Sequence, residues 1–358
     1  MILLVPRSTP SALWQIATPV MAVLATMLTG GLLFWILGHD PLAAIRTIFL
    51  DPLFGPAASY SRPQLLVKAA PLILIASGLA IGFRAGIWNI GAEGQYIIGA
   101  LTGAAVALAL YPLEAWWLFP LMVVAGLAGG WAWGMIPALL RNWFGASEIL
   151  VSLMLVYVAQ RVAAWMAFGP MRNPQGMGFP GSRNLQQYPS AANPELIAGT
   201  GAHWGVVAAA VAVLATWFLM SRHIRGFHIR AAGTAPRAAR FAGVNPATLV
   251  AFCLGLSGAL AGAAGLFEAA GPAGQITDRI GVGYGFTAII VAFLGRLHPV
   301  GILLAGLLLA LTYIGGELAQ MTMQLPAASV QVFQGMLLFF LLGFDLLTRY
   351  RLTRRVHA

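Results

Sequence analysis

The residues best suited to chemistry stand in one apolar run near residue 90. Within Gly-Ile-Trp-Asn-Ile-Gly-Ala-Glu-Gly-Gln-Tyr (86–96), Asn89, Glu93 and Gln95 lie among glycines and apolar residues. An ionisable group costs about 3 kcal/mol in the middle of a membrane helix, and it usually faces a protein interior or a watery path. These side chains therefore indicate either a solute pathway or polar contacts that join helices. Asn89 and Glu93 are four residues apart, so we expect them to share one helix face, whereas Gln95 points elsewhere.

Two aromatic residues are further candidates for a solute pathway. Tyr284 and Phe286 begin a short apolar segment. An aromatic ring can stack on a base or a sugar, although aromatic residues are also common at membrane interfaces for structural reasons.

One serine motif raises an alternative, an intramembrane protease. Gly255-Leu256-Ser257-Gly258 looks like the short motif around the nucleophile of rhomboid-type serine proteases. A nucleophilic serine needs a base within hydrogen-bond reach, but all six histidines fall in loops or at segment ends. We therefore favour a structural role, in which small residues let helices pack closely. These residues are Ser257, Gly258, Ala261, Gly262 and Gly265.

Other chemistry is excluded or unsupported by the residue inventory. The single cysteine, Cys253, rules out an intrachain disulfide and a cysteine-built metal site, and we expect no catalytic residue, metal or cofactor. The only lysine, Lys68, follows Leu-Leu-Val, whereas a phosphate-binding loop needs Gly-x-x-x-x-Gly-Lys-Ser/Thr. This chain therefore cannot hydrolyse ATP through that motif.

The composition places these residues in a lipid bilayer. Of 358 residues, 59% are hydrophobic and 8% are charged, against about 25% charged in soluble domains. The net charge of +10 comes from arginines scattered among short loops, which argues against a nucleic-acid partner. We expect an all-α polytopic membrane protein, built as a single transmembrane domain over residues 1–358.

Apolar runs long enough to cross a bilayer predict about ten transmembrane segments. Tyr284–Leu294 is the short one, either a tilted crossing or a re-entrant helix. Ser147 before Glu148 predicts a helix N-terminus, where the helix dipole favours a carboxylate. The nine clear runs are 12–37, 65–83, 87–110, 115–140, 149–168, 204–220, 247–270, 299–318 and 330–347.

Basic residues near the membrane ends predict the orientation. Ten crossings with a cytoplasmic start place thirteen arginines inside, which favours a protein with both termini cytoplasmic. Loops 39–64 and 169–203 are then external, and loop 221–246 is cytoplasmic. Opposite entry directions of spans two to five and seven to ten suggest an inverted repeat.

The cytoplasmic loop contains a short predicted helix. Pro236 suits a first helical position, and Gly243 suits the end of the helix. A basic helix of this kind either lies on anionic lipid or docks in a groove of a cytoplasmic protein.

Four stretches together resemble the permease subunits of ribose/nucleoside-type ABC importers. They are 86–95, 144–159, 230–244 and 285–301, and the resemblance covers most of the chain from Leu65 onward. The form Asn-Ile-Gly-Ala-Glu-Gly-Gln is similar to the nucleoside branch. The chain departs from the family's common asparagines at Ser147, Val156 and Ala235, and a sugar or branched-chain amino acid remains an alternative substrate, as does an ion-coupled secondary transporter.

The resemblance implies partners and roles. We expect a cytoplasmic ATP-binding subunit with tandem nucleotide-binding domains, a second homologous permease, an external substrate-binding protein and a bacterial inner-membrane location. The implied substrate pathway contains Asn89, Glu93, Gln95, Tyr284 and Phe286. The implied coupling residues for the ATP-binding subunit are Arg230, Gly233, Pro236, Arg237, Ala238, Ala239, Arg240 and Gly243.

Overall fold

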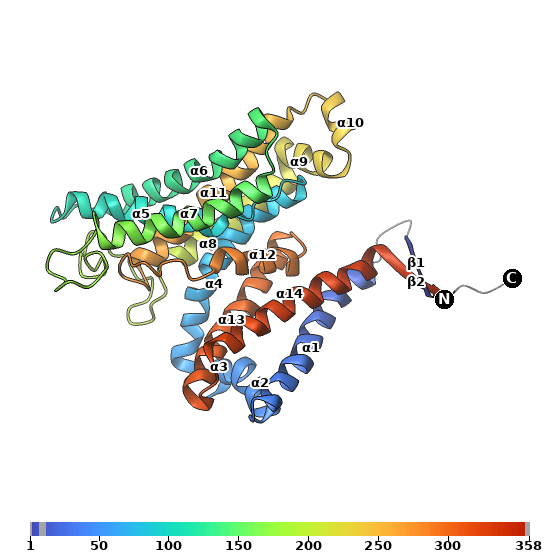
Figure 1. The fold of residues 1–358 in the computed structure, drawn as a ribbon, viewed down its shortest axis with the longest axis horizontal. Helices are drawn as coiled ribbons and strands as arrows, with labels where there is room; N and C mark the ends of the chain where they lie inside the picture. Colours follow the sequence, from blue (N-terminus) through green and yellow to red (C-terminus); the bar gives the residue numbers. More distant parts are fainter. Residues whose placement is uncertain (1, 7–11, 355–358) are drawn as a thin grey trace. The chain divides into compact units, whose positions relative to one another are not determined.

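The computed structural model describes residues 2–6 and 12–354, and nearly all of their regular structure is helical (Figure 1). This confirms the all-α prediction. The helices are α1 (Ala12–Ile36), α2 (Pro41–Phe49), α3 (Asp51–Phe54), α4 (Ala58–Arg84), α5 (Ala92–Leu110), α6 (Leu118–Phe144), α7 (Glu148–Phe168), α8 (Trp204–Arg222), α9 (Ile224–Thr234), α10 (Pro236–Phe241), α11 (Pro246–Ala270), α12 (Tyr284–Leu294), α13 (Pro299–Met323) and α14 (Ala327–Arg349). Two short strands, β1 (Ile2–Pro6) and β2 (Tyr350–Arg354), pair antiparallel.

Eight helices in the described residues are long and apolar enough to cross a membrane. The remaining two predicted segments coincide with the apolar helices α12 and α14. Helix α12 has 11 residues, which at 1.5 Å per residue gives about 16 Å, roughly half the hydrocarbon thickness. Its status as a tilted crossing or a re-entrant helix stays a prediction, as does the inverted repeat.

Two segments predicted as loops contain helices. Segment 39–64 holds α2 and α3 and the start of α4. Asp40 caps α2 by accepting a hydrogen bond from the Leu42 backbone N–H at 2.9 Å, and Pro41 occupies the first turn. The apolar side chains of Ile48 and Phe49 are buried, and this burial stabilises a short helix that its sequence alone does not announce. Segment 221–246 holds α9 as well as the predicted α10.

The described chain divides into two compact units, and α4 and α13 carry the chain from one to the other. One unit is Met1–Arg62 with Leu311–Ala358. Within it α1 and α14 lie side by side (Figure 1), and a Cβ built on Gly30 would lie 2.6 Å from the Phe333 ring. Phe333 also contacts Phe49, with 5.8 Å between ring centroids. The expectation of one transmembrane domain stays a prediction.

The other unit, Pro63–Ala310, is built around α5, α6 and α11, which pack along one another (Figure 1). Glycines make this contact possible. A Cβ on Gly99 would lie 2.1 Å from the Gly262 Cα, and a Cβ on Gly262 would lie 2.3 Å from the Gly126 carbonyl oxygen. The predicted small-residue surface of α11 is therefore confirmed as a site of close backbone approach.

A matched pair of glycine substitutions tests this packing. We expect Gly262→Ala to lower the thermal unfolding midpoint of the purified chain clearly, because added volume in a closed contact costs about 1–3 kcal/mol. Gly335→Ala on α14 is the control, since no described heavy atom lies within 4 Å of its added Cβ. Alanine there should leave the midpoint unchanged or raise it, as alanine favours a helix by up to about 1 kcal/mol over glycine. Equal midpoints for the two variants would contradict the close approach.

Candidate functional site

Glu93 connects helix α5 to the start of helix α12. Its side chain is 1% exposed. One carboxylate oxygen accepts a hydrogen bond from the Gly283 N–H at 2.7 Å, and the other accepts from the Gly285 N–H at 2.6 Å. N–H groups at a helix start have no partner within their own helix. A carboxylate on α5 therefore supplies the cap that the first turn of α12 lacks.

The two glycines that bind Glu93 are required by the local geometry. Gly283, the N-cap residue of α12, has a φ of +88°, a left-handed conformation that favours glycine. A Cβ on Gly285 would lie 2.2 Å from the Glu93 backbone nitrogen. These contacts place the α12 N-terminus directly against the first turn of α5.

Asn89 and Gln95 form a second buried polar contact with Ser257 of α11. The Asn89 amide nitrogen donates to the Gln95 Oε1 at 2.8 Å and to the Ser257 hydroxyl at 2.9 Å. All three side chains are buried. Ser257 thus accepts from an amide, which cannot serve as the base that a nucleophilic serine needs. The arrangement supports the structural role expected for the Gly255–Gly258 stretch.

The prediction that Asn89 and Glu93 share a helix face is wrong. Asn89 precedes α5, which begins at Ala92. Gly86 has a φ of +72°, and the Asn89 Oδ1 accepts from the Gly91 N–H at 3.0 Å in a local turn. Because residues 87–91 are not helical, the Asn89 side chain reaches Gln95 instead.

The aromatic candidates differ in exposure. Tyr284 is 2% exposed, and its ring meets Tyr96 edge-on with 6.0 Å between centroids. The Lys68 ammonium lies 5.9 Å from the Tyr284 ring centroid. Phe286, two residues further along α12, is 39% exposed. Of the two rings, Phe286 is the exposed one.

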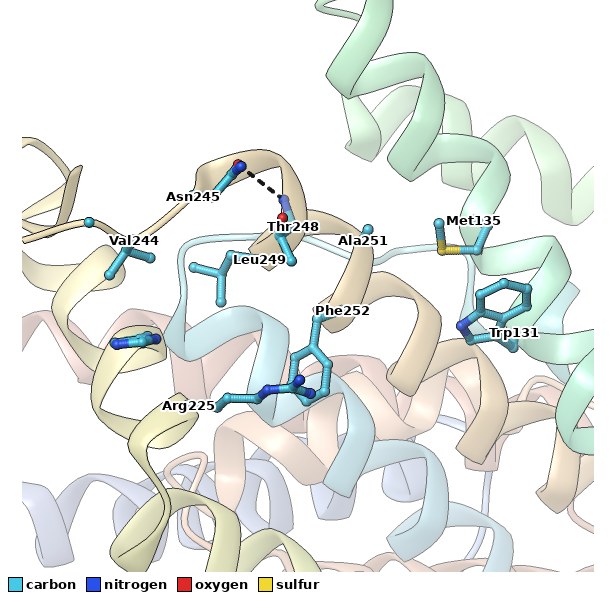
Figure 2. Close-up of a pocket in the computed structure, with 11 residues that line it drawn as sticks. Trp131, Met135, Arg225, Val244, Asn245, Thr248, Leu249, Ala251 and Phe252 are labelled. Carbon is cyan, nitrogen blue, oxygen red and sulfur yellow. Dashed lines mark hydrogen bonds between the residues drawn. The ribbon is translucent and has the colours of Figure 1, made fainter.

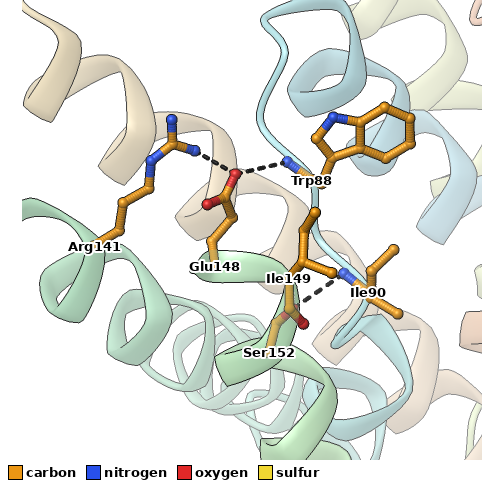
Figure 3. A network of polar contacts seen from close by, with 6 residues as sticks. All are labelled: Trp88, Ile90, Arg141, Glu148, Ile149 and Ser152. Atoms are coloured by element: carbon orange, nitrogen blue, oxygen red, sulfur yellow. Dashed lines mark hydrogen bonds and ion pairs between the residues drawn. The ribbon is translucent and has the colours of Figure 1, made fainter. Parts of the chain in front are cut away.

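Residues 88–90 are also fixed to the start of α7 (Figure 3). Helix α7 begins at Glu148 with Ser147 as its N-cap residue, as predicted. The Glu148 carboxylate forms an ion pair with Arg141 at the end of α6 and accepts from the Trp88 N–H at 3.4 Å. The Ser152 hydroxyl accepts from the Ile90 N–H at 3.2 Å. The sequence analysis did not identify Arg141 and Ser152 as partners of this loop and helix. The one signal for Arg141 was its position as a basic residue seven positions before Glu148.

The cytoplasmic candidate helix α10 forms as predicted, with Pro236 in its first turn. Gly243, just after it, has a φ of +85°. Arg237, Ala238 and Arg240 are exposed. Ala239 is 4% exposed and Phe241 is 94% exposed. Ala239 therefore packs against its own chain, while Phe241, which the sequence analysis did not single out, is the exposed large apolar side chain of this helix.

The segment carrying α10 lies against the ends of the transmembrane helices. A cavity of about 320 Å³ is bounded by Pro236, Ala239 and Arg240 on one side and by Ile87 and Arg141 on the other. A Cβ on Gly233 would lie 2.0 Å from the Arg84 carbonyl oxygen, and the Arg230 guanidinium donates to the Met220 carbonyl. The candidate coupling residues thus adjoin the loop that holds Asn89.

The segment 169–203 is attached to the chain that follows α11. The Ser182 N–H donates to the Ile276 carbonyl at 2.9 Å, and the Asn193 N–H donates to the Ala270 carbonyl at 2.9 Å. His203 caps α8 by accepting from the Gly205 N–H at 3.0 Å. Burial lowers the pKa of His203 to about 4, so this cap stays neutral at ordinary pH. The segment forms an ordered surface beside α11.

Membrane-length helices with a buried polar cluster between them define a multi-pass membrane protein. The family model described as "Branched-chain amino acid transport system / permease component" matches residues 62–342, and the chain belongs to this family. It is a permease of the ribose/nucleoside-type ABC importers, whose permease subunits are non-catalytic and rely on separate ATP-binding subunits.

Three relatives illustrate the relationship. The chain is 36% identical to a glucose ABC transporter permease of Haloferax volcanii, over 97% of this chain and 92% of the relative. It is 27% identical to a guanosine ABC transporter permease of Bacillus subtilis, over 91% and 92% of the two chains. It is 25% identical to a nucleoside ABC transporter permease of Lactococcus lactis, over 91% and 90%. No solved structure matches this chain.

Proposed function

We propose that this chain is the permease of an importer for a neutral solute built on a sugar ring, either a monosaccharide or a nucleoside. The observation that carries the proposal is the similarity over almost the whole chain to permeases named for glucose, guanosine and nucleosides. Glucose is itself a sugar, and guanosine is a base joined to a sugar, so a sugar ring is what the two solutes have in common. The motif at 89–95 favours a nucleoside, and the higher identity to a glucose permease favours a sugar.

The polar cluster supports a role in shaping the pathway. Both Glu93 oxygens accept backbone hydrogen bonds, and Asn89 bonds to Gln95 and Ser257. Because these groups are already paired inside the chain, we infer that Glu93 fixes the α12 N-terminus beside the pathway and that Asn89 fixes its own loop to α5 and α11. Phe286, with its exposed ring, is the residue that we assign to stacking on the solute.

Three partners complete the transporter. An ABC importer permease works with an ATP-binding subunit and a substrate-binding protein. We propose that the ATP-binding chain carries tandem nucleotide-binding domains and receives α10 with Phe241 in its groove. A second homologous permease forms the other wall of the pathway, and the ordered segment 169–203 faces the binding protein.

We propose that the protein lies in the bacterial inner (plasma) membrane with both termini in the cytoplasm. The excess of arginines near the ends assigned to the inside supports it. The antiparallel pairing of β1 with β2, with Ile2 opposite Arg354, supports both ends lying on one side. Closure of the ATP-binding subunits would then move α9 and α10 against the ends of α4 and α6 and switch the side on which the pathway opens.

Identification of the bound solute tests this proposal. We expect the assembled importer, purified with its binding protein and extracted with organic solvent, to release a solute with a pentose or hexose ring in mass spectrometry. A matched sample that contains the ATP-binding and permease subunits but lacks the binding protein is the control for solute that does not come from the binding protein. Recovery of a branched-chain amino acid in place of a sugar-ring solute would overturn the proposal.

A further inference from the structure

A cavity of about 400 Å³ lies between α6, α9 and α11, within the unit Pro63–Ala310 (Figure 2). It is separate from the Glu93 cluster, and Phe241 does not line it. Both polar and apolar side chains line it. The polar ones include Arg225, His228 and Asn245, and the apolar ones include Phe252, Met135 and Trp131.

The polar part of the lining carries positive charge without an internal counter-ion. Among the described residues, none of those that line the cavity is acidic, and no carboxylate forms an ion pair with Arg225. Residues 196–267 contain no Asp or Glu. The Arg225 guanidinium instead lies over the Phe252 ring, 4.9 Å from its centroid (Figure 2). A guanidinium at a membrane surface binds a phosphate group through paired hydrogen bonds.

The apolar lining residue Trp131 contacts α11 well beyond the start of that helix. Asn245 is the N-cap of α11. Trp131 packs on Gly255, where an added Cβ would lie 2.6 Å from the indole nitrogen. Ten residues of helix separate Asn245 from Gly255, which gives about 15 Å at 1.5 Å per residue. That depth is about half of the roughly 30 Å hydrocarbon core.

We propose that this cavity is a binding site for one anionic phospholipid of the adjacent leaflet. The phosphate binds Arg225 and His228, and an acyl chain lies along Phe252, Met135 and Trp131. A free phosphate would use only Arg225 and His228, whereas apolar side chains that suit an acyl chain also line the cavity. Because α9 leads directly to α10, the bound lipid would hold the segment that precedes the coupling helix.

Lipid binding to the purified full-length chain tests the proposal. Native mass spectrometry of the delipidated chain, with added phosphatidylglycerol or phosphatidylcholine of identical acyl chains, should show one tightly held phosphatidylglycerol. We expect Arg225→Gln to weaken its binding about fivefold, the effect of losing one arginine beside an anionic lipid. Arg222→Gln is the matched control, because Arg222 is exposed but does not line the cavity, and it should bind as the wild type does.

A second measurement places the acyl chain. Phosphatidylglycerol with brominated acyl chains should quench tryptophan fluorescence, and Trp131→Phe should remove a saturable part of that quenching. Equal binding of the two lipids, unchanged affinity in Arg225→Gln, or quenching independent of Trp131 would each overturn the proposal. So would glycerol phosphate binding as tightly as the whole lipid, because the site would then recognise only a phosphate.

Discussion

Replacing Phe241 by alanine is expected to abolish ATP-driven uptake by the assembled importer. Phe241 is 94% exposed at the end of a helix whose Ala239 faces the permease itself. Large aromatic side chains that fill a partner's pocket commonly contribute about 2 kcal/mol or more to binding. Its loss should weaken the hold of the ATP-binding subunit at least about thirtyfold. Binding of that subunit, measured by surface plasmon resonance, checks the result.

Phe54→Ala is the control for this prediction. Phe54 is an equally large, exposed ring on α3, on the side that we assign to the exterior. This variant should bind the ATP-binding subunit as the wild type does. If Phe241→Ala also binds and imports normally, α10 is not the docking helix.

Replacing Glu93 by alanine is expected to lower the yield and thermal stability of the folded chain. The change leaves the buried N–H groups of Gly283 and Gly285 without their acceptor. Each unpaired buried donor costs about 1–3 kcal/mol. Glu93→Gln should fall between wild type and alanine, because its amide retains one acceptor oxygen but turns an NH₂ group toward the second N–H. Thermal unfolding of the detergent-purified variants measures this order.

Glu114→Gln provides the control, since Glu114 is exposed and its neutralisation should leave stability unchanged. Uptake per folded complex separates the structural role from a direct role in the pathway. A structural role predicts that the folded fraction of Glu93→Gln imports well. If Glu93→Gln instead had wild-type stability but lost import, the carboxylate would contact the solute. Its hydrogen bonds to the start of α12 would then not be its function.

The buried polar residues could be predicted from the sequence, because polar groups in an apolar run stand out by the free energy they cost. Their pairing could not. The partners of Glu93 lie 190 and 192 positions away, and they are backbone groups that no side-chain pattern reveals. The wrong prediction for the helix face of Asn89 has a local cause. The left-handed conformation of Gly86 and the turn at Asn89 keep the residues before Ala92 out of helical geometry, so α5 begins only at Ala92.

The exposed face of α10 shows a second limit of sequence reasoning. The proline and glycine that bound this helix are visible in the sequence. Which side of a six-residue helix faces solvent depends on what it packs against, and here that is the chain near Ile87 and Arg141. Ala239 is therefore buried against its own chain, and Phe241 is the exposed apolar side chain of this helix.

The most direct test of the central claim is uptake into proteoliposomes that contain the assembled importer and its binding protein. ATP is supplied on the side of the ATP-binding subunit, and an ionophore collapses the membrane potential. The account predicts that a labelled nucleoside or monosaccharide still accumulates, and that a non-hydrolysable ATP analogue stops it. Uptake that continues without ATP hydrolysis and disappears with the membrane potential would contradict an ATP-driven importer and indicate an ion-coupled transporter.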